Sequence, residues 1–231
     1  MTGDTTTGDT TTGDTMTGDT TTGDTTTGDT TTGDTTRGDS KRGESGAPDP
    51  ARLLRDVLTK TADLLAGIRE DQWHTPTGCA DWDVQALADH IVQWGRVFAA
   101  GLAGERRDDD PEAYRPTDHA ADFRAVRDSA VDGVRRLGLD RQVTLVSGSS
   151  PGPAVAAMAV GEYVAHGWDL ATATGQPVPY TDEEARLAHE GLAPMLLDEY
   201  RGPGKPFGYA LPAPPHASEL VRMLRFSGRP A

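Results

Sequence analysis

The chain has 231 residues and a formal net charge of −14, so it has room for one domain of ordinary size. It is a poor match for nucleic acid or an anionic membrane, because binding to polyanions depends on clustered Lys and Arg. It contains one cysteine, which excludes an intramolecular disulfide, and neither a long apolar run nor the basic, apolar start of a secretion signal. These features predict a cytoplasmic protein without a membrane span.

Residues 1–46 differ in composition from the rest. Glycine recurs at every fifth position from Gly3 to Gly38, followed by Asp and mostly by Thr. Apart from the initial methionine, Met16 is the one large apolar side chain of this segment, so no core can offset the entropy lost on ordering it. We predict a disordered tail over residues 1–46 and one folded domain over residues 47–231.

The first predicted helix begins at Pro50, behind Asp49 as its N-cap, and an apolar stripe follows at residues 54–68. Proline, glycine and polar residues predict a loop over residues 71–82. That loop contains two tryptophans that should pack back onto the helices, Trp73 and Trp82.

The second predicted helix starts near Asp83, and its apolar stripe leaves His90 at the edge of the buried face. A third helix covers residues 123–137. Residues 142–146 favour a short β segment, which residues 147–152 should end as a turn.

The fourth predicted helix runs from Ala154 to about Thr174, before Gly175, and its apolar pattern indicates a central, buried helix. After it, a helix opened by a capping box and a last helix over residues 218–226 are expected. The capping box consists of Thr181 and Glu184.

Two polar side chains interrupt the fourth helix. Glu162 and His166 lie about 40° apart on the helical wheel, in a sector of apolar neighbours. A buried carboxylate must be protonated, paired with a cation or bound to a metal. With His90 as a third donor, the set suits zinc with an open position for water or substrate, and iron, nickel or manganese also fit. Taken alone, a helical histidine is more often a hydrogen-bonded structural residue, and a glutamate and a histidine four residues apart are more often a solvent-exposed pair.

Asp169 and Cys79 each have a functional and a structural interpretation, whereas the other residues named below have one. Asp169 could hydrogen-bond a ligand imidazole from the second coordination shell, or pair with a neighbouring helix or an arginine. For Cys79, a small packed residue is favoured over a reactive or ligating thiol. Trp168 should pack in the core. The remaining histidines are expected at the surface: His74, His119, His189 and His216.

The stretches from Thr77 to His90 and from Gly161 to Ala171 resemble the metal-binding domain of mycothiol-dependent maleylpyruvate isomerases, a branch of the DinB-like superfamily. The resemblance extends to residues 172–177 and 226–230. It implies that His90, Glu162 and His166 bind a zinc-type ion, and that in some members this ion activates the sulfur of a low-molecular-weight thiol. The isomerases carry a further C-terminal domain, whereas about 55 residues follow the fourth helix here. The isomerase reaction itself is therefore not expected.

We thus predict an all-α, DinB-like four-helix bundle with a short β segment and additional C-terminal helices. The leading functional hypothesis is a metal-dependent transferase that uses a mycothiol-type thiol to attack a small electrophile. The alternatives are a non-catalytic metal-binding module, in which a fourth protein ligand closes the coordination shell, and a metal-free bundle. A homodimer is compatible with the sequence, which identifies neither the substrate nor the native metal.

Overall fold

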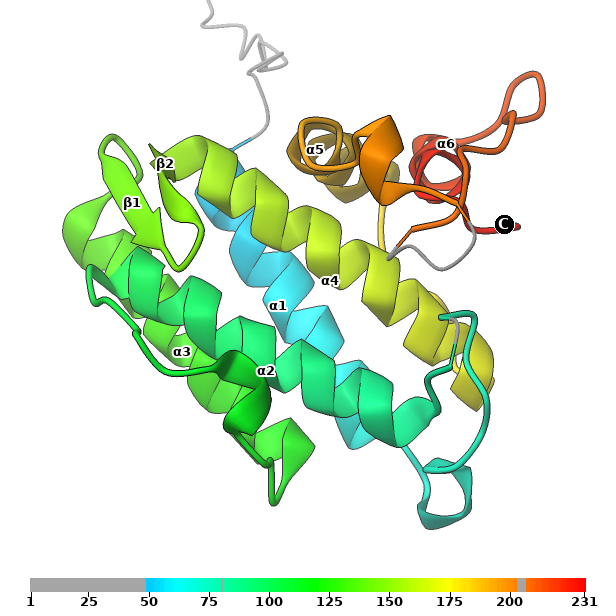
Figure 1. Cartoon of the computed structure of the whole chain (residues 1–231), viewed down its shortest axis with the longest axis horizontal. Helices are drawn as coiled ribbons and strands as arrows, with labels where there is room; N and C mark the ends of the chain where they lie inside the picture. Colours follow the sequence, from blue (N-terminus) through cyan, green and yellow to red (C-terminus); the bar gives the residue numbers. More distant parts are fainter. Residues whose placement is uncertain (1–48, 80, 203–206) are drawn as a thin grey trace, which may run out of the picture. The chain divides into compact units, whose positions relative to one another are not determined.

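A computed structural model describes residues 49–79, 81–202 and 207–231. Within these ranges the chain forms mainly helices, which confirms the predicted predominantly helical fold (Figure 1). The helices are α1 (Pro50–Ala66), α2 (Val84–Ala103), α3 (His119–Leu137), α4 (Gly152–Thr174), α5 (Asp182–Leu192) and α6 (Glu219–Phe226), and the strands are β1 (Gln142–Leu145) and β2 (Gly148–Pro151). None of these helices combines the length and the apolar character needed to cross a lipid bilayer. The tail predicted over residues 1–46 lies outside the described residues.

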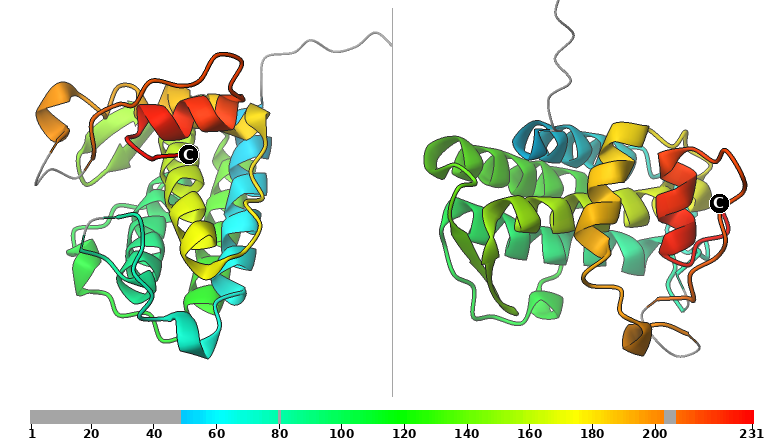
Figure 2. Two further views of the ribbon diagram at one scale, coloured as in Figure 1. Left: turned by 90° about the vertical axis from the view of Figure 1, so that its right-hand side faces the viewer. Right: turned by 90° about the horizontal axis from the view of Figure 1, so that it is seen from above.

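The four long helices pack side by side. Helix α1 contacts α3 and α4, and α2 also contacts α3 and α4, so each long helix has two long neighbours. Helix α5 packs against α4, and α6 packs against α5 (Figure 2). The central position predicted for α4 is confirmed, because its side chains are buried around the helix, among them Val155, Val160, Tyr163 and Leu170. Such burial is what an apolar helix without a polar stripe requires.

The helix ends follow local signals in the sequence. Asp49 accepts a hydrogen bond from the backbone N–H of Ala51 at 3.0 Å, and Pro50 is the first residue of α1. Helix α4 ends at Gly175, whose φ of +68° is a left-handed conformation that glycine adopts without strain. The capping box predicted at the start of α5 is present. These local signals fix where the buried faces of the helices begin and end.

The segment after β1 differs from the prediction. Residues 147–152 were expected to form a turn, but Gly148–Pro151 is a strand that pairs antiparallel with β1, from Gln142 opposite Pro151 to Leu145 opposite Gly148. Gly148 has a φ of +126°, which favours glycine, and the Thr144 and Ser149 hydroxyls are hydrogen-bonded across the hairpin at 2.8 Å. The strand is mostly exposed, so it needs no apolar alternation, and its composition therefore resembles that of a turn.

Candidate metal centre

Three side chains from two helices converge on one point. The Nε2 atom of His90, on α2, lies 2.8 Å from Oε1 of Glu162, on α4. The Nε2 atom of His166, also on α4, lies 3.3 Å from the same oxygen. One donor atom from each residue lies within 4.8 Å of the other two. The structure therefore brings together the three residues that the sequence singled out.

The fold explains this convergence. Glu162 and His166 are one turn apart on α4, and α2 packs against α4 with His90 at the edge of its buried face. The three side chains are 9–18% exposed. The Trp82 ring lies against both imidazoles, with centroid distances of 4.6 Å to His90 and 5.9 Å to His166, and restricts how they turn.

The charges of the triad support one another. Burial opposes a charge on Glu162, but the neighbouring His166 and His90 hold the pKa of its carboxyl well below the usual range. Burial likewise opposes a charge on His166, yet Glu162 and Asp169 raise the pKa of this imidazole well above its ordinary value. Without a metal, these shifts favour a carboxylate paired with an imidazolium. A divalent cation replaces the protons of such a site when it binds.

A second layer of polar groups lies behind His166. The Oδ2 atom of Asp169 is 3.4 Å from Nδ1 of His166, and Asp169 is 1% exposed. Arg229 donates from Nη2 to Oδ2 of Asp169 at 2.6 Å and from Nε to Oδ1 at 2.9 Å. Asp169 therefore fills both of the roles weighed for it, since it contacts the imidazole and also pairs with an arginine. This arrangement turns Nδ1 of His166 toward Asp169 and leaves Nε2 facing Glu162.

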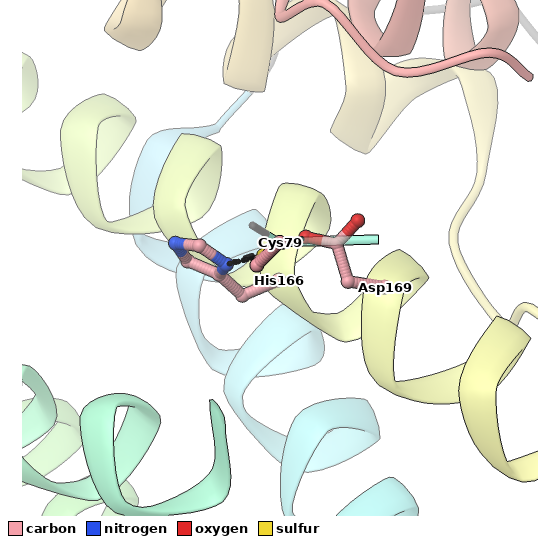
Figure 3. Close-up of side chains that lie close together, drawn as sticks. All are labelled: Cys79, His166 and Asp169. Atoms are coloured by element: carbon pink, nitrogen blue, oxygen red, sulfur yellow. Dashed lines mark hydrogen bonds and ion pairs between the residues drawn. The ribbon is translucent and has the colours of Figure 1, made fainter. Parts of the chain in front are cut away.

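Cys79 joins this second layer. Its Sγ donates to Oδ2 of Asp169 at 3.1 Å and lies 3.7 Å from Nδ1 of His166 (Figure 3). Cys79 is half-buried and packs against the core, as favoured from the sequence, but it also completes a second group of potential ligands with His166 and Asp169. That group is the weaker metal site, because Arg229 already neutralises the Asp169 carboxylate.

The chemistry of the first group fits a divalent transition metal. Two imidazole nitrogens and one carboxylate oxygen are the donors of many catalytic zinc sites, which keep a fourth position for water or substrate. A ligating imidazole usually has an acceptor on its other nitrogen, and for His166 the Asp169 carboxylate lies at that nitrogen, 3.4 Å away. The residues in place therefore suit zinc, and the same donors suit other first-row divalent ions.

The triad borders a cavity of about 780 Å³. Helix α2, the hairpin and α4 supply its walls, together with the C-terminal stretch that includes Met195 and Arg229. Apolar side chains predominate, including Trp94, Phe98, Leu145 and Met158. A cavity of this size accommodates an organic molecule beside the three donors.

Two histidines are less exposed than the sequence predicted, and the role of one arginine was not predicted. His119 was expected at the surface, but its side chain is 10% exposed and its Nε2 lies 2.6 Å from Oδ1 of Asp89. His189 stacks on Phe226 at 4.5 Å, whereas His74 is exposed, as predicted. The role of Arg229 was missed, although the closing segment that contains it was part of the family resemblance.

Comparisons with known proteins match the part of the chain that contains the triad. The model of the mycothiol maleylpyruvate isomerase N-terminal domain family matches residues 54–171. Two relatives in Mycobacterium tuberculosis, the uncharacterized proteins Rv0738 of strain H37Rv and MT0763 of strain CDC 1551, are each 33% identical over 175 residues, covering 73% of this chain and 91% of the relative. No solved structure matches the chain. The region matched by the family model contains the triad and Asp169 but not Arg229.

Proposed function

The chain belongs to the mycothiol maleylpyruvate isomerase N-terminal domain family, and from this premise we propose that it binds one divalent metal ion, zinc for preference, through His90, Glu162 and His166. We further propose that this site serves the transfer of a mycothiol-type thiol to a small electrophile, in a four-helix bundle of DinB-like topology. The observation that carries the proposal is the convergence of two imidazoles on one carboxylate oxygen at the wall of a cavity.

The residues of the site have separable tasks in this proposal. When bound, the metal would lower the pKa of a coordinated thiol, so that thiolate is present at neutral pH. Asp169 lies beside Nδ1 of His166, which orients Nε2 toward the ion, and Trp82 limits rotation of both imidazoles. The apolar walls exclude water from the reacting groups. In the overall reaction, the thiol S–H bond and a carbon–leaving group bond break, a C–S bond forms, and the proton departs with the leaving group.

A non-catalytic metal-binding module is the competing function. Structural zinc sites are closed by four protein ligands, whereas catalytic sites keep an open position. Among the residues that the structure describes, the group around Glu162 has three protein donors and adjoins the cavity, which favours chemistry over bracing. A cytoplasmic location, small-molecule partners and a homodimer stay predictions.

Metal analysis of the purified full-length chain tests the site. We expect about one equivalent of metal per chain after dialysis, measured by elemental mass spectrometry, and its loss in His90→Ala and in His166→Ala. His74→Ala is the matched control, because His74 is 89% exposed and lies outside the triad. If both triad variants kept the metal content of the control, the proposed ligand set would be wrong.

Thiol binding tests the reaction class. Calorimetric titration of mycothiol into zinc-loaded protein should show binding that is absent in His166→Ala and in metal-free parent protein. The zinc-loaded protein should then accelerate consumption of an alkyl halide or an epoxide only when the thiol is present. Stoichiometric zinc without any thiol binding would instead establish the non-catalytic module.

A further inference from the structure

The polar side chains of the cavity are gathered at one end. Apart from Ser147, the polar lining residues all belong to the triad or to the network behind it: Cys79, His90, Glu162, His166, Ser227 and Arg229. Ser227 belongs to that network because its hydroxyl accepts a hydrogen bond from Nη1 of Arg229 at 3.0 Å. The cavity therefore has one polar end that holds the metal donors and one end that is almost entirely apolar.

The apolar end extends along two antiparallel helices. Figure 1 shows α2 and α4 running in opposite directions, with the hairpin at the end where α2 finishes and α4 begins. From His90 to Phe98 on α2, and from His166 back to Met158 on α4, the lining residues span eight positions, which corresponds to about 12 Å of helix. Leu145 of the hairpin lines the far end. An extended chain of about ten carbons covers a similar length, at about 1.2 Å per chain atom.

The cavity offers no spare positive charge among the lining residues that the structure describes. Arg229 is their one arginine, with no lysine beside it. Its Nε and Nη2 bind Asp169 and its Nη1 binds Ser227, so three of its five N–H groups donate within the network and its charge is paired with Asp169. A carboxylate at the far end of a ligand would lie against apolar side chains, away from this polar end, which weakens its binding.

We infer that the electrophile taken by this site is a largely apolar molecule, an alkyl chain or ring system of about ten carbons, with its reactive carbon at the triad end and its body between α2, α4 and the hairpin. The inference rests on the proposed function, because it names the substrate class of the same site. The juxtaposition that carries it is a metal-donor triad at one end of an apolar channel whose arginine is already paired.

Hydroxamates of increasing chain length test this inference without a chemical reaction, because their head group binds divalent metals and their tail enters the cavity. We expect the dissociation constant of the zinc-loaded protein, measured by calorimetry, to fall roughly threefold for each methylene from acetohydroxamate to octanohydroxamate. The monohydroxamate of suberic acid has the same length but ends in a carboxylate. It should bind at least about tenfold more weakly than octanohydroxamate, because its carboxylate would lie against the apolar side chains at the far end of the cavity.

A pair of variants locates the effect. Met158→Gln, which places an amide in the apolar wall, should reduce the gain per methylene, whereas Leu137→Gln on α3, at a half-exposed site outside the lining, should leave it unchanged. If acetohydroxamate bound the zinc but affinity did not rise with length, the inference would be overturned while the metal site stood. The same series with zinc-free protein measures the contribution of the cavity walls alone. An affinity that rises with chain length there supports the apolar cavity even if the metal site fails, and an affinity independent of chain length counts against it.

Discussion

Two neighbouring residues of α2, Asp89 and His90, belong to two different histidine–carboxylate groups. Asp89 binds Nε2 of His119 at 2.6 Å, near the start of α3, with the Trp73 ring 4.9 Å from the imidazole. His90 binds Glu162 of α4 at 2.8 Å and lies against Trp82. Successive helical residues point about 100° apart, so one helix supplies both groups to different neighbours.

The difference between the groups shows what distinguishes the candidate metal site from a structural contact. Both have a short carboxylate–imidazole distance and a tryptophan beside the ring. The group around Glu162 also has a second imidazole directed at the same oxygen, a cavity on one side, and the buried pair of Asp169 and Arg229 behind it. A histidine paired with an acid is therefore insufficient as a signature, and the additional layers carry the assignment.

The largest effect should come from the buried pair that only the Glu162 group has. Replacing Arg229 with methionine leaves the Asp169 carboxylate buried without its main counterion, which should lower the free energy of unfolding by about 3–5 kcal/mol. Urea unfolding of metal-free protein measures this loss. In the double variant with Asp169→Asn part of the stability should return, because the unpaired charge is gone.

The control for Arg229 is another arginine from the same end of the chain. Arg222 is exposed on α6 and donates to a backbone carbonyl, so Arg222→Met should change the unfolding free energy by less than about 1 kcal/mol. Equal stabilities of the Arg229 and Arg222 variants would show that the second layer contributes nothing to the fold, and would remove this contrast between the two groups.

Metal uptake by the Glu162 group should depend on pH. Glu162 and Asp169 raise the pKa of His166 against the effect of burial, so its imidazole is protonated at neutral pH in the metal-free protein. The metal must displace that proton, and zinc affinity should fall about tenfold for each unit of pH below the raised pKa. Calorimetry in two buffers of different ionisation enthalpy should detect about one proton released per zinc. Zinc binding without proton release would contradict this charge assignment.

The raised pKa of His166 makes the stability of the metal-free protein fall as the pH rises, whereas zinc affinity rises with pH. Because the folded pKa of His166 lies above its unfolded value of about 6.5, its contribution is fully present below that value. It is lost as the pH rises through the folded pKa. Unfolding curves of metal-free protein should therefore show declining stability on the alkaline side, and His166→Ala should remove that decline.

The group around His119 should respond differently. His119→Ala removes the bond to Asp89 and should lower the free energy of unfolding by about 2 kcal/mol, because a hydrogen bond to a charged carboxylate contributes about 1.5–3 kcal/mol. The metal content should stay that of the parent chain. Loss of metal in this variant would mean that the two groups are coupled through α2, and the comparison between them would fail.

The sequence predicted those parts of the molecule that depend on local signals. The boundaries of α1 and α4 follow from Asp49, Pro50 and Gly175, and the burial of α4 follows from its apolar pattern. The spacing of Glu162 and His166 predicted a shared face, and the edge position of His90 made it available to α4. The proximity of all three depends on how α2 packs against α4, for which the sequence offered only the family resemblance.

Features that depend on distant contacts left no periodic signal. Arg229 is 60 residues from Asp169 in the chain, and no spacing rule connects the two. The contact of His119 with α2 depends on how the first turn of α3 is packed. Strand β2 is held by backbone pairing rather than by side chains, so its glycine, serines and proline looked like a turn.

The smallest effect concerns Cys79 and decides between the two groups of potential ligands. Cys79→Ser keeps a hydroxyl donor for Asp169, so the unfolding free energy should change by less than about 1 kcal/mol and the metal content should not change. Cobalt-substituted parent and variant should have the same visible and near-ultraviolet spectra, without a thiolate-to-cobalt charge-transfer band. If the parent showed such a band and Cys79→Ser abolished it, the ion would be bound by Cys79, His166 and Asp169, and His90 and Glu162 would form a structural contact like the one around His119.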